Sequence, residues 1–71
     1  MIVGVPREVK PGEQRVALLP EAVRAIVEER HDVQVETRAG LTAGFDDEDY
    51  RDARATIVTA RDAWDAELVV K

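Results

Sequence analysis

Residues 2–23 read IVGVPREVKPGEQRVALLPEAV. Residues 2–5 are an apolar, β-branched run that stops at Pro6, because proline has no N–H to give to a sheet. Runs that are apolar on both faces are typical of parallel sheets with helices on both sides. Pro20 suits the first position of a helix, where its φ is already set and its missing N–H does no harm. We therefore expect a buried strand, a long connection, and a helix that begins at Pro20.

The same alternation of short strands and helical patterns continues to the end of the chain. Strands are expected at 33–37, 57–58 and 68–70, the first with one wetter face and near a sheet edge. Repeated strand–helix–strand units pack as a parallel sheet with right-handed crossovers. The fold class is therefore α/β, a parallel sheet of βαβ units. Two further expectations are a helix cap made by Thr59 with Asp62 and a core position for Trp64 with its indole N–H at the surface.

The acidic cluster at 46–49 is explained by the start of a helix. With Asp46 as N-cap, Asp49 takes the third helical position of a capping box, and Phe45 can pack on Tyr50 as a hydrophobic staple. A metal site would need further oxygen ligands, and none is placed to help. The sequence thus predicts no metal-binding residues.

Composition limits the classes of function. The chain has 71 residues, a net charge of −5, no cysteine and a single histidine, which excludes disulfides and a zinc site. The acidic balance argues against nucleic acid, whose phosphates require a basic face. No apolar run approaches the roughly 20 residues that span a bilayer, and the N-terminus does not resemble a signal peptide. We expect a soluble, cytoplasmic chain with no membrane segment.

A nucleotide site is not expected within these residues. A dinucleotide fingerprint would place GxGxxG directly after the first strand, where this chain has PREVKPGEQR. The glycines at 39–44 have the wrong spacing for a phosphate cradle, so a plain connecting loop is expected there. No cofactor-binding residue is predicted.

The connection at 6–19 is longer than the usual strand-to-helix link and carries Arg15. It leaves the carboxyl end of the first strand, which is where open parallel sheets bind ligands. Two interpretations stay open on physical grounds. Arg15 is a surface residue paired with Glu13 or Glu8, or it binds a ligand.

Four blocks of sequence carry a family resemblance, namely the segment at 2–23, HDVQVE at 31–36, AGLTAGFDDEDY at 39–50 and WDAELVVK at 64–71. Together they resemble the N-terminal region of the alanine dehydrogenase and pyridine nucleotide transhydrogenase family. The block at 39–50 is nearer to the alanine dehydrogenases. A sheet with so few helices would also leave part of its core open to water. We therefore expect residues 1–71 to be an incomplete, Rossmann-like part of a larger substrate domain, with the nucleotide-binding domain absent.

The resemblance implies a function for the complete family member. It interconverts L-alanine with pyruvate and ammonium, uses NAD, and assembles as a homo-oligomer. Arg15 is implied to bind the substrate carboxylate, and a guanidinium fork suits that task. No catalytic role is carried to His31, and the family's substrate lysine matches a position after Lys71. The segment is thus expected to be inactive alone.

Two other hypotheses stay open. One is a segment of a proton-translocating transhydrogenase α subunit, and the other is a non-enzymatic remnant or interaction module that folds on a partner. The sequence also departs from the family at Arg30, Arg38 and Arg54, where members usually have glycine. These glycines are expected to supply left-handed backbone, which costs a non-glycine residue roughly 1 kcal/mol.

Overall fold

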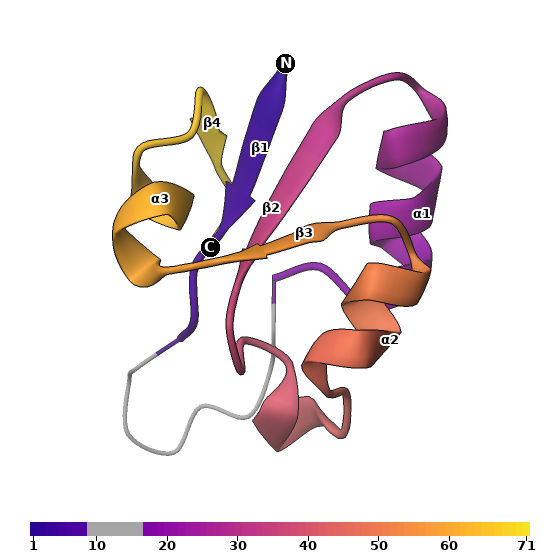
Figure 1. The fold of residues 1–71 in the computed structure, drawn as a ribbon, viewed down its shortest axis with the longest axis vertical. Coiled ribbons are helices and arrows are strands. Elements are labelled where there is room, and N and C mark those ends of the chain that lie inside the picture. The colour runs from indigo at the N-terminus through magenta and orange to yellow at the C-terminus, as the bar shows by residue number, and fades with distance from the viewer. Residues whose placement is uncertain (9–16) are drawn as a thin grey trace.

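The structure is a computed structural model that describes residues 1–8 and 17–71. Its strands form one four-stranded sheet, in the order β3-β2-β1-β4, and every pairing is parallel (Figure 1). The expected α/β class is confirmed, and the architecture is Rossmann-like. The elements in chain order are β1 (Ile2–Val5), α1 (Pro20–Glu28), β2 (Asp32–Glu36), a short 3-10 helix η1 (Leu41–Ala43), α2 (Asp47–Asp52), β3 (Thr56–Val58), α3 (Ala60–Trp64) and β4 (Leu68–Val69).

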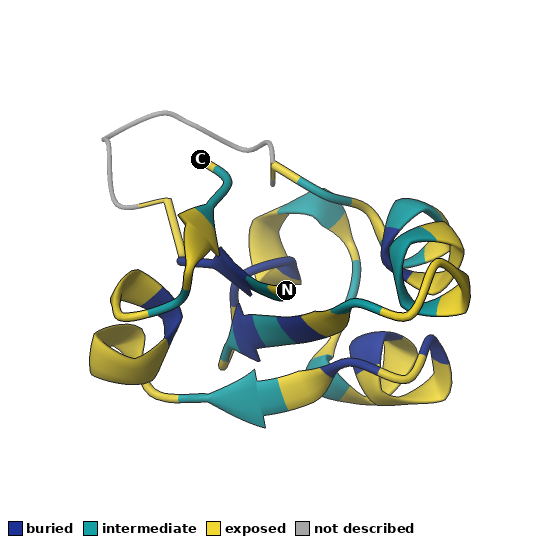
Figure 2. Ribbon diagram, turned by 90° about the horizontal axis from the view of Figure 1, so that it is seen from above, coloured by how far each residue is buried: buried dark blue, intermediate teal, exposed yellow. Residues whose placement is uncertain are grey.

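Helices cover both faces of the sheet. Seen along the molecule, α1 and α2 lie on one face and α3 on the other (Figure 2). Gly4 makes room for α3, because a Cβ at this position would come within 2.0 Å of the Ala63 carbonyl oxygen. The main chain of α3 therefore touches β1 directly, and the sequence of β1 needs a glycine at that point.

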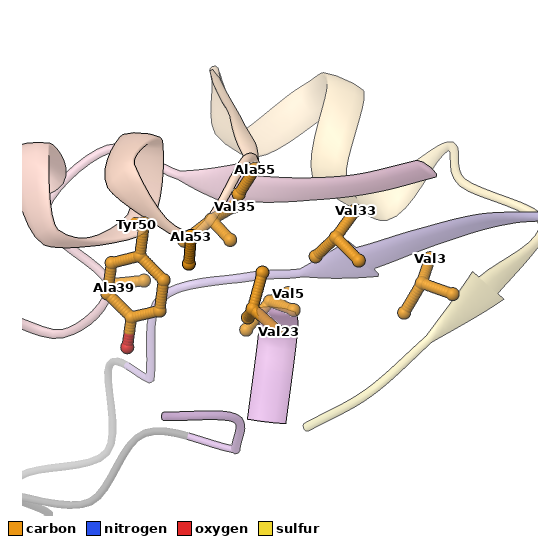
Figure 3. Packing of buried hydrophobic residues seen from close by; sticks show 9 residues of the cluster. All are labelled: Val3, Val5, Val23, Val33, Val35, Ala39, Tyr50, Ala53 and Ala55. Carbon is orange, nitrogen blue, oxygen red and sulfur yellow. The ribbon is translucent and has the colours of Figure 1, made fainter. Parts of the chain in front are cut away.

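The core lies between the sheet and the α1–α2 layer (Figure 3). Alternate residues of the central strands point into it, as the two-residue period of a strand requires. Fully burying one such valine stabilises the fold by roughly 1.5–3 kcal/mol. The buried cluster contains Val3, Val5, Val23, Val33, Val35, Ala39, Tyr50, Ala53 and Ala55.

Both predicted helix caps are present. The Asp46 carboxylate accepts from the Asp49 N–H at 3.0 Å, and the Asp49 carboxylate accepts from the Asp46 N–H at 3.0 Å, which completes the capping box. At α3, the Thr59 hydroxyl oxygen accepts from the Asp62 N–H at 3.4 Å. Helix α1 begins at Pro20 as expected, and Glu21 places negative charge in its first turn.

The second strand was expected near a sheet edge with one wetter face, and β2 is next to the edge strand β3. It is itself an interior strand, because it pairs with β1 on one side and with β3 on the other. Its alternation follows from the layers that cover its two faces. Val33 and Val35 face the core, whereas Gln34 lies on the face that, among the described helices, the five-residue α3 covers. That thin layer leaves Gln34 half-buried, so a polar side chain is tolerated there.

The core position expected for Trp64 is also wrong, since this side chain is 49% exposed. Helix α3 turns Ala63 toward β1, and the next residue along a helix points about 100° away. The ammonium group of Lys71 lies over the Trp64 ring instead, 4.9 Å from its centroid.

The three arginines at expected glycine positions all have left-handed backbone. Their φ angles are 70° at Arg30, 68° at Arg38 and 74° at Arg54. Arg30 and Arg54 end α1 and α2 in Schellman turns, in which the following N–H groups of His31 and Ala55 return to the helix. Arg38 lies in the turn after β2. The expected left-handed positions are therefore confirmed.

Candidate functional site

The carboxyl ends of β1 and β2 lie at the same edge of the sheet, because the strands are parallel neighbours. The connection to α1 leaves this edge, and ligands bind at this edge in open parallel sheets. Arg15, the predicted substrate-binding residue, lies outside the described residues. The structure describes what comes before and after it, namely residues 6–8 and 17–19.

The first end of the connection is tied to β2. The Arg7 main-chain N–H donates a hydrogen bond to the Glu36 carboxylate at 2.8 Å. Glu36 is the last residue of β2, and the pair before it in the register is Val5 with Val35. The chain leaving β1 is thus bonded to the neighbouring strand one residue beyond Pro6.

The second end is tied to α2. The Tyr50 hydroxyl donates a hydrogen bond to the Leu18 carbonyl oxygen at 2.9 Å. Burial, followed by the charge of Asp49, raises the pKa of Tyr50 to about 12, so the hydroxyl keeps its proton at neutral pH. Neither Tyr50 nor Glu36 was recognised from sequence as part of this region. Their partners are 32 and 29 residues away, and no local pattern signals bonds of that kind.

A shallow hollow lies beside the start of α1. Its volume is about 420 Å³, and its lining is mostly apolar. Glu21 is its one charged residue among those described, and a carboxylate would repel an anionic ligand. The described lining of the hollow therefore includes no cationic side chain that would bind a carboxylate. It is lined by Ala17, Leu18, Leu19, Glu21, Ala22 and Ala25.

A second hollow of about 330 Å³ lies over the acidic cluster. Asp47 accepts from the Thr37 hydroxyl at 2.6 Å and from the Arg38 N–H at 2.8 Å, while Arg51 pairs with Glu48. The hydrogen bond from Thr37 lowers the pKa of Asp47 below 3.8. The carboxylate oxygens of Asp47 therefore stabilise the turn in which Arg38 has left-handed backbone. Residues 1–8 and 17–71 contain no group of three or more acidic, histidine or cysteine side chains that could hold a metal ion.

The described residues do not fit a dinucleotide cofactor. β1 continues into Pro6, not into a glycine-rich turn that opens a helix. Each described glycine is used by the fold itself. Gly4 admits α3, Gly40 lies against the Tyr50 ring, and Gly44 takes φ 93° at the end of η1. The loop at 39–44 is thus a connection built around Tyr50.

His31 lies apart from the connection, whereas Lys71 follows β4 at the sheet edge where the connection leaves β1. His31 follows α1 at the opposite edge of the sheet, next to the start of β2. Its Nδ1 is buried and makes no hydrogen bond to the described residues. Lys71 follows β4, with its ammonium group over Trp64. Neither side chain is bonded to the residues that flank Arg15.

Residues 4–71 match the family model described as "Alanine dehydrogenase/PNT, N-terminal domain". The chain belongs to this family. Among curated proteins, the alanine dehydrogenases of Staphylococcus haemolyticus (strain JCSC1435) and Bacillus subtilis (strain 168) are each 49% identical to it over 72 residues. Each alignment covers 100% of this chain and 19% of the relative.

Solved structures of the alanine dehydrogenase/PNT family give the same picture. An L-alanine dehydrogenase matches with a TM-score of 0.98 and 53% identity, and a transhydrogenase from Sinorhizobium meliloti matches with 0.95 and 38%. Both matches cover 100% of this chain and 20% of the solved chain. The resemblance predicted from sequence is confirmed, and it is nearer to alanine dehydrogenase.

The chain spans about a fifth of the length of these relatives and corresponds to the N-terminal domain of alanine dehydrogenase family proteins. In the part of the chain that the structure describes, no helix is both long enough and apolar enough to cross a membrane.

Proposed function

We propose that this chain is the N-terminal segment of the substrate domain of an NAD-dependent alanine dehydrogenase. The complete enzyme converts L-alanine, NAD and water to pyruvate, ammonium and NADH. The observation that carries the proposal is the 49% identity to alanine dehydrogenases along the whole chain. In this proposal the nucleotide-binding domain lies outside residues 1–71. The segment is therefore inactive by itself.

Arg15 is the substrate-binding residue in this proposal. A guanidinium presents a planar fork of donors that matches a carboxylate with two parallel hydrogen bonds. Fixing the carboxylate of alanine or pyruvate would orient the reacting carbon toward the cofactor that the rest of the enzyme supplies. The position of Arg15 in the sequence, after the carboxyl end of β1, supports this role.

A chimaera tests the proposal. Residues 1–71 replace the matching segment of the Bacillus subtilis alanine dehydrogenase, which is 49% identical. We expect alanine-dependent NADH formation, and we expect Arg15→Ala to lower kcat/KM for pyruvate roughly 10- to 100-fold, because a charge-assisted hydrogen-bond pair is lost. Arg61→Ala, which removes an exposed arginine from α3, is the matched control. An active chimaera indifferent to Arg15→Ala would refute the assigned role.

A transhydrogenase segment is the second candidate. The TM-score of 0.95 to the Sinorhizobium meliloti transhydrogenase favours keeping it, while the higher identity to alanine dehydrogenases favours the first. Turnover of alanine by the complete protein separates the two, because a transhydrogenase passes hydride between two nicotinamides and needs no amino acid.

The proposal extends to surroundings and assembly. The acidic composition and the lack of cysteine suit a cytoplasmic enzyme, and the complete protein is proposed to be a homo-oligomer. Size-exclusion chromatography with light scattering on the complete enzyme measures the assembly. A monomer at micromolar concentration would contradict this part.

A further inference from the structure

The order of the strands and the sides of the helices indicate where this sheet can be extended. From β1 to β3 the chain moves toward one edge, with α1 and α2 on one face; it then returns past β1 to β4, with α3 on the opposite face (Figure 2). Right-handed crossovers require this change of face, because the direction of travel across the sheet has reversed. A further right-handed unit that continues outward from β4 would therefore place its strand beside β4 and its helix on the α3 face.

The outer edge of β4 presents main-chain groups that can pair with another strand. β4 pairs with β1 in a register that sets Val69 opposite Gly4, and the Val70 N–H donates to the Gly4 carbonyl oxygen at 2.9 Å. Successive residues of a strand turn their N–H groups to opposite sides, so the Val69 N–H and carbonyl point away from β1. Within residues 1–8 and 17–71, no strand lies beyond β4. This edge can therefore accept one more parallel strand.

Apolar side chains flank the same edge on both faces of the sheet. Gly4 faces α3, so its register partner Val69 faces α3 as well, and Leu68 faces the other way. Leu68 is 47% exposed, and the Trp64 ring on α3 is 49% exposed. α3 itself lies over β1, β2 and β3. An open edge strand with apolar side chains around it is a surface that a finished sheet covers.

We propose that the outer edge of β4 and the Trp64 side chain form a docking surface for a strand and an amphipathic helix from the remainder of the complete enzyme. The strand pairs in parallel with β4, and the apolar face of the helix covers Trp64. This inference rests on the proposed function. The occupant belongs to the same chain, because residues 1–71 span about a fifth of the alanine dehydrogenase relatives, and residues that follow Lys71 in the complete enzyme start beside this edge at high effective concentration.

Hydrogen exchange on the chimaera described above tests the strand. The Val70 amide is bonded to Gly4 inside the sheet and serves as the reference for its neighbour Val69. In the 71-residue chain, the Val69 amide should exchange at least roughly 100-fold faster than the Val70 amide. In the chimaera, the two rates should agree within about tenfold, because both amides then lie in the ladder. A Val69 amide that is still about 100-fold faster in the chimaera would overturn the inference.

Hydroxyl-radical labelling read by mass spectrometry tests the helix. Leu41, which is 56% exposed on η1, is the matched control for Trp64. From the 71-residue chain to the chimaera, labelling of Trp64 should fall at least roughly fivefold, while labelling of Leu41 stays within about twofold. Equal labelling of Trp64 in the two proteins would mean that no helix covers the ring.

Two comparisons separate this inference from its alternatives. Light scattering on the 71-residue chain reports self-association. A dimer that Leu68→Lys dissociates, together with an open Val69 amide in the chimaera, would assign the edge to a second copy and contradict the inference. Alanine turnover is an independent readout. An inactive chimaera with a protected Val69 amide keeps the docking surface and removes the proposed function, whereas an active chimaera with an open Val69 amide removes the docking surface alone.

Discussion

Replacing Arg30, Arg38 and Arg54 by glycine should stabilise this fold. All three have φ between 68° and 74° and exposed side chains, so the change relieves strain and loses little packing. Left-handed backbone costs an L-residue about 1–2 kcal/mol, and glycine removes this cost. Glycine also makes the unfolded chain more flexible, which lowers the stability of the fold by about 0.5–1 kcal/mol. Each substitution should therefore add about 0.5–1 kcal/mol. The three sites lie in separate turns, so the triple variant should gain about 1.5–3 kcal/mol.

Urea denaturation followed by far-UV circular dichroism measures the effect. With a slope of about 1 kcal/mol per molar urea for a small protein, the midpoint of the triple variant should rise by about 1.5–3 M at constant slope. Two controls separate the backbone from the side chain. Alanine at the same positions keeps the strain and should give no gain, and Arg61→Gly in helical α3 should cost about 1 kcal/mol. The reasoning is refuted if alanine stabilises as much as glycine, or if glycine destabilises.

Three further outcomes follow from single side chains. Asp47→Asn should lower the free energy of unfolding by about 1 kcal/mol at pH 7. Because the folded pKa of Asp47 is lowered, its contribution is present above pH 3.8 and disappears as the pH falls through the folded pKa. Urea midpoints of the parent and the variant should therefore differ less at pH 3 than at pH 7. Tyr50→Phe should lower the free energy of unfolding by about 1 kcal/mol at pH 7. Since the folded pKa of Tyr50 is raised to about 12, the parent should lose stability as the pH rises from 10 toward 12. Urea midpoints measured across this pH range should show the loss in the parent and not in the variant. Gly4→Ala should destabilise by about 1–3 kcal/mol or more, because its Cβ would lie 2.0 Å from the Ala63 oxygen; an unchanged thermal midpoint would show that α3 does not rest on β1.

The elements could be predicted wherever the decisive signal is local. Pro6 ends a strand and Pro20 begins a helix through their missing N–H groups, and Asp46 with Asp49 marks a capping box within four residues. Other features depend on neighbours, and the expectation that failed, a core position for Trp64, is one of them. The polar alternation of β2 reflects the thin α3 layer above it, and Trp64 is exposed because Ala63 takes the contact with β1. No local pattern reports either condition.

The candidate site was less accessible to sequence reasoning than the fold. Arg15 could be singled out only through a resemblance, because a lone arginine on a long polar connection has no pattern of its own. Tyr50 was understood as a packing partner of Phe45, and its ring is indeed in the core. Its hydroxyl bond to Leu18 depends on how α2 docks beside α1, which is a property of the assembled layers.

The hydrogen bonds from the Arg7 N–H to Glu36 and from the Tyr50 hydroxyl to the Leu18 carbonyl also have a consequence for the order of folding. Each joins atoms about 30 residues apart, so neither can form until β2 has paired with β1 and α2 has docked. Contacts of this kind belong to the late, downhill part of folding, and substitutions at the Tyr50 hydroxyl or at Glu36 should speed unfolding with little change in the folding rate. A newly made chain would thus complete its helices and sheet before the main chain at Arg7 and Leu18 is bonded to β2 and α2.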